Sequence, residues 1–160
     1  MPVIDTHTDP ENCSLTITAE FAAPVERLWQ VYADPRQLEK IWGPPEFPAT
    51  VVDHDLTPGG RVTYYMAGPD GERYHGFWDV KEVQENQRIR IDEGFANPDF
   101  TPAEGMPVAD QEFTFSPAEG GSRLVAVATY GSAEELQQVV DMGAVEGATG
   151  AMNQIDALVA

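Results

Sequence analysis

Turn signals recur at short intervals between residues 49 and 130, and this spacing constrains the fold more than any other feature. Gly68-Pro69-Asp70-Gly71 is a strong hairpin signal, because proline presets φ and glycine accepts a positive φ. Pro58-Gly59-Gly60, Glu85-Asn86 and the 118–121 segment separate further strand-like runs. Apolar residues at helical spacing do not intervene. The segment therefore predicts a meander of antiparallel strands.

A strand and two short helices are expected before this meander. Apolar and polar residues alternate over residues 14–21, which is typical of a half-buried strand. Pro24 opens a helix at a position where its missing N–H costs nothing. Asp34-Pro35 ends that helix, and a second short helix stops at Gly43-Pro44-Pro45.

A capping box at Ser132-Ala133-Glu134-Glu135 starts the last element. We expect one helix from there to the C-terminus. It would contain about 28 residues and be roughly 40 Å long at a rise of about 1.5 Å per residue. One stripe of this helix contains Leu136, Val140, Gly143, Gly147, Ala151, Gln154 and Leu158. Each glycine costs up to about 1 kcal/mol of helix propensity, so the sheet or a ligand is expected to approach the backbone there.

A chain of 160 residues is long enough for one hydrophobic core and short for two. We therefore expect a single domain over residues 14–160. Residues 1–13 lack a periodic pattern and are expected to be a flexible N-terminal arm. Residues 96–107 hold three prolines and Gly105, and a loop of this length is more often a binding loop or lid than a plain connector.

The net charge of −18 excludes several kinds of partner. So acidic a chain repels nucleic acid and anionic membrane surfaces. Because it has neither a long apolar stretch nor a signal peptide, we expect no membrane insertion and a cytoplasmic location. Cys13 is the single cysteine, so an internal disulfide is ruled out, and an ordinary small residue is favoured there over a reactive thiol.

No metal or cofactor is expected. Asp53-His54-Asp55 invites a metal interpretation, but strand alternation sends His54 to the face opposite both carboxylates. His7 and His75 lie far from His54 in the sequence, so no two histidines have the spacing that is typical of metal ligands. The serines do not occur in a nucleophile elbow, and the chain has no glycine-rich phosphate loop.

Several motifs in fixed order carry a family resemblance. They are Phe21-Ala22-Ala23-Pro24-Val25-Glu26-Arg27-Leu28-Trp29, Asp34-Pro35, Trp42-Gly43-Pro44, Asp55-Leu56-Thr57-Pro58-Gly59-Gly60-Arg61, Pro69-Asp70-Gly71 and Met142-Gly143-Ala144-Val145-Glu146-Gly147. The chain resembles the START-like (SRPBCC, birch-pollen-allergen) superfamily over about residues 14–158. Within it, the chain is similar to homologues of the C-terminal domain of the cochaperone that activates the ninety-kilodalton heat-shock protein ATPase. The resemblance implies an α+β helix-grip fold, in which a curved antiparallel sheet of six or seven strands wraps a long C-terminal helix.

The same resemblance implies a cavity between sheet and helix. Together with strand alternation it gives the expected lining: Trp42, Phe47, Tyr64, Met66, Trp78, Phe95, Phe113, Val140, Gly143 and Gly147. The alternative is a solid core in which the aromatic rings interdigitate with the glycines. Phe95 and Phe100 could close the cavity mouth or merely fix the long loop. Members of the branch often carry a tryptophan where this chain has Ala148, which implies more room here.

Three functions remain open at this point, because such folds host many activities. The leading hypothesis is a noncatalytic protein, monomeric or homodimeric, that binds a small hydrophobic, aromatic or lipid-like molecule. The acidity favours neutral or cationic ligands over anionic ones. The second hypothesis is an interaction module that stimulates a chaperone ATPase. The third is a cyclase-like or hydrolase-like enzyme that uses Tyr64 or Glu93. Glu93, in phase with Ile89 and Ile91, and Glu146 are candidates for acid–base chemistry, against the alternative of ordinary surface carboxylates.

Overall fold

The computed structural model describes residues 2–160, which form one antiparallel sheet and five helices. The strands are β1 (Val3–Asp9), β2 (Ser14–Phe21), β3 (Ala49–His54), β4 (Arg61–Ala67), β5 (Arg73–Gln84), β6 (Arg88–Ala96), β7 (Val108–Ala118) and β8 (Gly121–Thr129). The helices are α1 (Val25–Ala33), α2 (Pro35–Trp42), α3 (Ala133–Asp141), α4 (Ala144–Asn153) and α5 (Ile155–Val159). The strand order is β1-β2-β8-β7-β6-β5-β4-β3. The expected α+β helix-grip fold is confirmed, with eight strands rather than six or seven.

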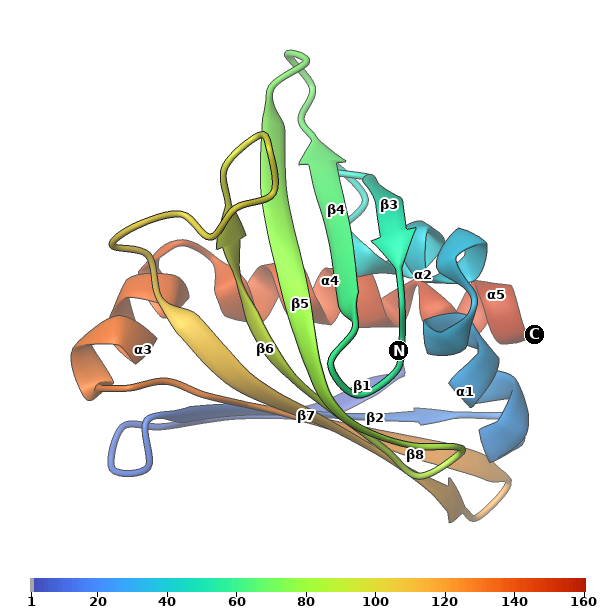
Figure 1. Cartoon of the computed structure of the whole chain (residues 1–160). Helices are drawn as coiled ribbons and strands as arrows, with labels where there is room; N and C mark the ends of the chain where they lie inside the picture. Colours follow the sequence, from blue (N-terminus) through green and yellow to red (C-terminus); the bar gives the residue numbers. More distant parts are fainter. Residues whose placement is uncertain (1) are drawn as a thin grey trace.

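The sheet is strongly curved, and α4 lies across its concave face (Figure 1). The two short helices α1 and α2 lie at one end of this concave face, and α3 lies at the other. Asp34 joins α1 to α2 and caps the second helix, because its side chain accepts a hydrogen bond from the backbone N–H of Arg36 at 2.9 Å. The helices therefore cover the concave face of the sheet.

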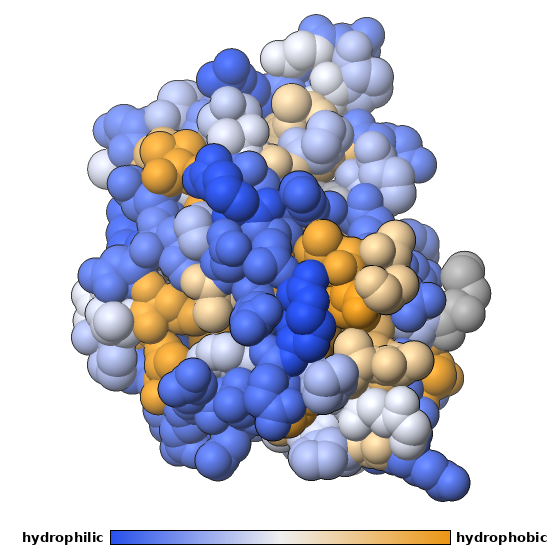
Figure 2. Space-filling view, turned by 90° about the vertical axis from the view of Figure 1, so that its right-hand side faces the viewer, coloured by the Kyte–Doolittle hydropathy of each residue, from blue (hydrophilic) through white to orange (hydrophobic). Residues whose placement is uncertain are grey.

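Strand alternation correctly predicts which side chains face this space. On β2, Leu15, Ile17, Ala19 and Phe21 are all buried, while the residues between them are partly exposed. The same period places Ile89 and Ile91 of β6 in the core. At the end of the molecule where α1, α2 and α5 lie, hydrophilic side chains cover most of the surface, with hydrophobic residues in separate patches (Figure 2).

The expected flexible arm is wrong for residues 3–9. They form β1, which pairs with β2 from Val3↔Ala19 to Asp9↔Ser14. Five of the seven β1 residues are exposed, so the strand shows no apolar alternation that a sequence pattern could reveal. Its order comes from the backbone ladder and from a 3.0 Å hydrogen bond that the Val3 N–H donates to Asn153 Oδ1 on α4.

The expected single C-terminal helix is three helices. Gly143 adopts φ +89°, a left-handed conformation that ends α3 and precedes α4. A second interruption occurs at Gln154, whose Nε2 donates to the Gly43 carbonyl oxygen at 2.7 Å. Because of the first break, the buried residues of α3 are Leu136 and Val139 instead of a stripe through Val140.

The long 96–107 loop packs on the outer face of the sheet. The Phe100 ring lies 5.4 Å from the His75 ring, and Arg61 Nη1 donates to the Phe100 carbonyl oxygen at 2.8 Å. Arg61 also covers the buried Phe77 ring, at 4.8 Å from its centroid. Phe100 therefore fixes the loop to the outer face, whereas Phe95 faces the interior. Within residues 2–160, helices of the length and apolarity needed to cross a bilayer are absent.

Candidate functional site

A cavity of about 950 Å³ lies between the concave face of the sheet and α4. Its walls come from the inner faces of β2 and β4–β8, from α1 and α2, from the 44–47 segment, and from the helices after β8. Most of the lining is apolar, with a few polar groups from tyrosine, glutamate and glutamine side chains. This combination is typical of a small-molecule site.

The structure brings eight of the ten expected lining residues to this cavity. They are Trp42, Phe47, Tyr64, Met66, Phe95, Phe113, Gly143 and Gly147. Trp78 does not reach the wall, since it is fully buried behind the Trp42 ring, 4.9 Å away between centroids. Val140 also lies off the wall, and Val139 takes its place because of the break at Gly143.

Trp42 is the centre of an aromatic cluster on one side of the cavity. Its ring meets Tyr64 edge to face at 5.8 Å and Phe113 at 6.2 Å between centroids. Such edge-to-face pairs are favourable beyond the area that they bury. Trp42 is the last residue of α2, so the short helix places this ring over β4, β5 and β7. The cluster gives the cavity a rigid aromatic wall.

The small residues of α4 face open space or proline. A Cβ added at Gly147 would meet no atom within 4 Å, so this position borders the empty part of the cavity. At Gly150 a Cβ would lie 3.6 Å from Pro45 Cδ, in ordinary contact. Ala148 also lines the cavity. The glycine at 147 is therefore not needed for packing against the protein's own atoms.

Gly76 makes room for the Tyr64 side chain on the neighbouring strand. The two residues are register partners on β4 and β5. A Cβ at Gly76 would overlap the Tyr64 hydroxyl and lie 2.5 Å from its Cζ. The absence of a side chain at Gly76 thus lets the phenol lie flat along the sheet at the cavity wall.

Glu93 is a carboxylate on the wall of this apolar cavity. Its register neighbours are Trp78 on β5 and Ala109 on β7. Burial raises the pKa of Glu93 from 4.5 to about 6, and a hydrogen bond from Gln111 Nε2 at 3.0 Å opposes part of that rise. Glu93 can therefore gain or lose a proton near neutral pH. The interpretation of Glu93 as an ordinary surface carboxylate is wrong.

Three tyrosines share the cavity wall with Glu93: Tyr32 on α1, Tyr64 on β4 and Tyr130 after β8. Burial raises the pKa of each phenol, and the negative charge of Glu93 raises it further. The phenols consequently stay protonated and can donate or accept hydrogen bonds. Glu146 lines the cavity too, but its side chain is exposed at the rim.

Several lining residues were not on the expected list. Tyr32, Glu46, Gln111 and Tyr130 all reach the cavity. The inward phase of Gln111 and Tyr130 was visible in the strand alternation, so that signal could have found them. Tyr32 carries no such signal, because its helical spacing is equally typical of a solid core.

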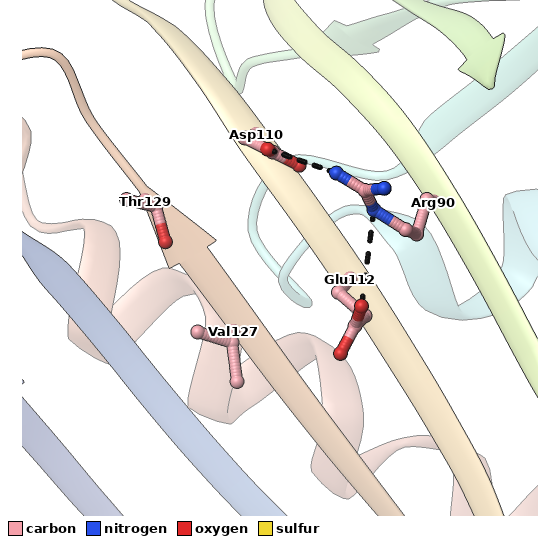
Figure 3. A pocket seen from close by; sticks show the side chains of 5 residues that line it. All are labelled: Arg90, Asp110, Glu112, Val127 and Thr129. Atoms are coloured by element: carbon pink, nitrogen blue, oxygen red, sulfur yellow. Dashed lines mark hydrogen bonds and ion pairs between the residues drawn. The ribbon is translucent and has the colours of Figure 1, made fainter. Parts of the chain in front are cut away.

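A small depression on the outer face of the sheet, about 160 Å³, is a weaker candidate. Arg90 lies there between Asp110 and Glu112, with its Nη2 3.2 Å from Asp110 Oδ2 and its Nε 3.8 Å from Glu112 Oε2 (Figure 3). Val127 and Thr129 complete the depression. Because its one cation is already paired with two carboxylates, the depression offers little for an anionic ligand to bind.

Metal binding finds no support in the described part of the chain, where no group of three His, Cys, Asp or Glu side chains converges. His54 Nε2 lies 3.0 Å from the Tyr32 carbonyl oxygen, and Asp53 accepts a hydrogen bond from Thr63 Oγ1 at 2.9 Å. These two residues thus have structural partners on different elements. Cys13 is partly buried and free, with its Sγ 3.8 Å from the Pro10 carbonyl oxygen.

The fold and the hollow interior define the class, a helix-grip domain with an internal cavity. The chain belongs to the family described as Activator of Hsp90 ATPase homolog 1-like protein, which matches residues 22–160. The crystal structure of protein Ms6760 from Mycobacterium smegmatis is 59% identical with a TM-score of 0.93, and the match covers 99% of this chain and 98% of that chain. A solution NMR structure of a protein from Arthrobacter aurescens is 38% identical with a TM-score of 0.93, over 98% of this chain and 91% of that one.

A more distant likeness supports the fold alone. The crystal structure of a Rhodobacter sphaeroides protein is 19% identical with a TM-score of 0.82, over 96% of both chains. None of the curated proteins compared matches the chain.

Proposed function

We propose that this protein binds a small apolar or aromatic molecule in the cavity between the sheet and α4. The observation that carries the proposal is the open space in front of Gly147, where an added Cβ would meet no neighbouring atom of residues 2–160 within 4 Å. In a solid core, the aromatic rings would fill that space. Instead about 950 Å³ is left beside the wall formed by Trp42, Tyr64 and Phe113.

Gly147→Leu tests this proposal. The leucine side chain would occupy the open space, so we expect the variant to lose binding to a panel of aromatic and aliphatic ligands while staying folded. Ala157→Leu is the matched control, because Ala157 is exposed on α5 and does not line the cavity. Equal binding by parent and Gly147→Leu would contradict the proposal. Gly143→Leu is a poorer test, since it would also strain a left-handed backbone.

Native mass spectrometry gives a second, independent readout. A purified protein that carries a passenger should show an added mass, which organic extraction would remove. We expect this added mass to be absent or reduced in Gly147→Leu and retained in Ala157→Leu. An added mass that is equal in all three proteins would place the passenger outside the cavity.

A second candidate function is acid–base catalysis on a molecule bound in the same cavity. Glu93 supports it, because its pKa of about 6 suits proton transfer near neutral pH and because it shares the wall with Tyr64 and Tyr130. The test is turnover of a bound carbonyl compound. A rate that depends on a group with a pKa near 6 and is lost in Glu93→Gln would support catalysis.

The family description also names an activator of a chaperone ATPase. We rank this activity below ligand binding, since the most developed feature of the chain is an internal cavity rather than an exposed docking face. Adding the protein to the chaperone and measuring ATP turnover tests it directly; a stimulated rate would raise its rank.

A further inference from the structure

The charges on the cavity wall all have the same sign. Three glutamates line it, Glu46, Glu93 and Glu146, and no lysine or arginine of residues 2–160 does. Glu46 and Glu146 are exposed at the rim, while Glu93 is half-buried in the wall. A ligand that enters this space therefore meets negative charge at the mouth and again inside.

The nine lysines and arginines of the chain are all engaged or exposed elsewhere. Six of them form ion pairs outside the cavity: Arg36, Arg61, Lys81, Arg88, Arg90 and Arg123. On β6 the separation is sharp, because Arg88 and Arg90 point outward to carboxylates while Glu93 points inward. Within residues 2–160, no lysine or arginine therefore lies on the cavity wall to neutralise Glu93.

Glu93 is also short of hydrogen bonds. Within residues 2–160 its carboxylate accepts one, from Gln111 Nε2 to Oε2. A carboxylate can accept about four, and a buried one without a charged partner is costly. Within residues 2–160, no hydrogen bond reaches the other oxygen, Oε1, and Glu93 itself lines the cavity. An unpaired acceptor of this kind is suited to a donor that arrives with the ligand.

The aromatic wall suits the same kind of ligand. The rings of Trp42 and Tyr64 meet edge to face at 5.8 Å and form part of the lining. Aromatic faces attract cations as well as apolar groups, most strongly where water is excluded. An apolar body with one positive charge would satisfy both the rings and Glu93.

We propose that the natural ligand is a lipophilic amine, protonated when bound, whose ammonium group pairs with the Glu93 carboxylate while its apolar body lies against Trp42 and Tyr64. This inference rests on the proposed binding function and narrows it to a class of ligand. It also disfavours fatty acids and other apolar carboxylates, because their charge would face Glu93 without a compensating cation.

Three probes with the same aromatic body separate the charge from the cavity. They are naphthylmethylamine, the neutral naphthylmethanol and the anionic naphthoate, each titrated calorimetrically into the parent at neutral pH. We expect the amine to bind at least about tenfold more tightly than the alcohol, since a charge-assisted hydrogen bond is worth that much. Naphthoate should bind most weakly.

Glu93→Gln assigns the preference to one residue. The amide keeps the shape of the side chain and an acceptor for Gln111, so the variant should bind the alcohol as the parent does. We expect its affinity for the amine to fall to the level of the alcohol. Glu85→Gln is the matched control, because Glu85 is exposed in the β5–β6 turn and should leave the amine preference intact.

The pH dependence gives a second readout. The titratable groups that share the cavity with Glu93 are the phenols of Tyr32, Tyr64 and Tyr130 and, at the rim, Glu46 and Glu146. We expect affinity for the amine to fall below about pH 6 in the parent, as Glu93 takes up a proton, and to stay level in Glu93→Gln. Glu85→Gln, which changes an exposed carboxylate outside the cavity, should keep the parent's profile.

The outcomes distinguish the two proposals. If the amine and the alcohol bind equally and Gly147→Leu abolishes both, the binding function stands and the inference about charge is wrong. If Glu93→Gln keeps the amine preference, the assignment to Glu93 is wrong. If none of the three probes binds the parent and native mass spectrometry finds no passenger, the binding function itself is overturned.

Discussion

Gln111 Nε2 donates a 3.0 Å hydrogen bond to Glu93 Oε2 across the two neighbouring strands β7 and β6. This hydrogen bond stabilises the charged form of a carboxylate that burial otherwise disfavours. The pKa of Glu93 therefore stays at about 6, so this side chain changes its charge near neutral pH. The stability of the protein depends on that charge.

Gln111→Leu should raise the pKa of Glu93 above about 6, because the substitution removes the one side-chain donor and adds apolar surface. An NMR titration of the Glu93 side-chain carboxyl resonance measures the change. Thr114→Leu is the control, since Thr114 is exposed on the outer face of the same strand. An unchanged pKa in Gln111→Leu would show that the hydrogen bond contributes nothing.

Glu93→Gln should stabilise the protein at alkaline pH. The folded state holds the Glu93 proton more tightly than an unfolded chain, whose carboxyl has a pKa near 4.5. The folded state is therefore increasingly penalised as pH rises from about 4.5 through about 6, and the penalty stays complete above that range. The amide variant escapes it, with an expected gain on the order of 1 kcal/mol at about pH 8.

Urea denaturation of parent and variant at several pH values measures this gain. The difference in free energy of unfolding should shrink as the pH falls from about 6 through about 4.5, and should vanish below that range, where Glu93 is protonated in both states. Glu85→Gln should show no comparable pH-dependent gain. A Glu93→Gln variant that is less stable than the parent at alkaline pH would contradict the prediction.

Ala148→Trp should fill part of the cavity. Ala148 lines the open space next to Gly147, so an indole there can pack against the aromatic wall. We expect naphthylmethanol affinity to fall at least about tenfold, while the free energy of unfolding stays within about 1.5 kcal/mol of the parent. Ala157→Trp makes the same change at an exposed position and should leave binding intact. Undiminished binding by Ala148→Trp would place the ligand elsewhere.

Gly76→Ala should displace Tyr64. The added methyl group would collide with the phenol, which lies across Gly76 on the neighbouring strand, so we expect a loss of about 1–3 kcal/mol in stability. In a Tyr64→Ala background the same change should cost much less, because the collision partner is gone. A double-mutant cycle measured by urea denaturation tests this coupling. Equal costs in the two backgrounds would rule out the collision.

Asn153→Ala should loosen the attachment of β1 to α4. The substitution removes the acceptor of the Val3 N–H bond, and the expected loss is about 0.5–1.5 kcal/mol. Hydrogen exchange at the Val3 amide should become faster. Gln138→Ala, at an exposed position on α3, is the control. Unchanged exchange at Val3 in Asn153→Ala would contradict the role of this bond.

The parts of the fold that follow from local chemistry could be predicted from the sequence. The alternation in β2 identified its buried face. The helix start at Ser132 was also correct, since Ser132 Oγ accepts from the Glu135 N–H at 3.1 Å, although the Glu135 side chain accepts from the Gly131 N–H instead of the Ser132 N–H. Strand alternation also placed Glu93 in phase with the core. In each case, neighbouring residues in the chain decide the outcome.

The remaining features depend on contacts between distant segments. Trp78 leaves the cavity wall because Trp42, far earlier in the chain, packs edge to face against it. Val139 replaces Val140 on the cavity wall because Gly143 breaks the helix. This break could not be predicted, because a glycine can adopt either a positive or a negative φ. Whether the aromatic residues would fill the interior or line it depends on their three-dimensional packing. The cytoplasmic location and the choice between monomer and homodimer stay predictions.

Strand β1 affects whether the sheet can pair with the sheet of a second copy of the protein. β1 is one edge of the sheet, and its exposed residues include Asp5 and His7. Polar and charged side chains on an edge discourage edge-to-edge pairing, whereas β2 without this cover would present free backbone groups beside alternating apolar residues. The segment that adds least to the core therefore protects the sheet from growing into an aggregate.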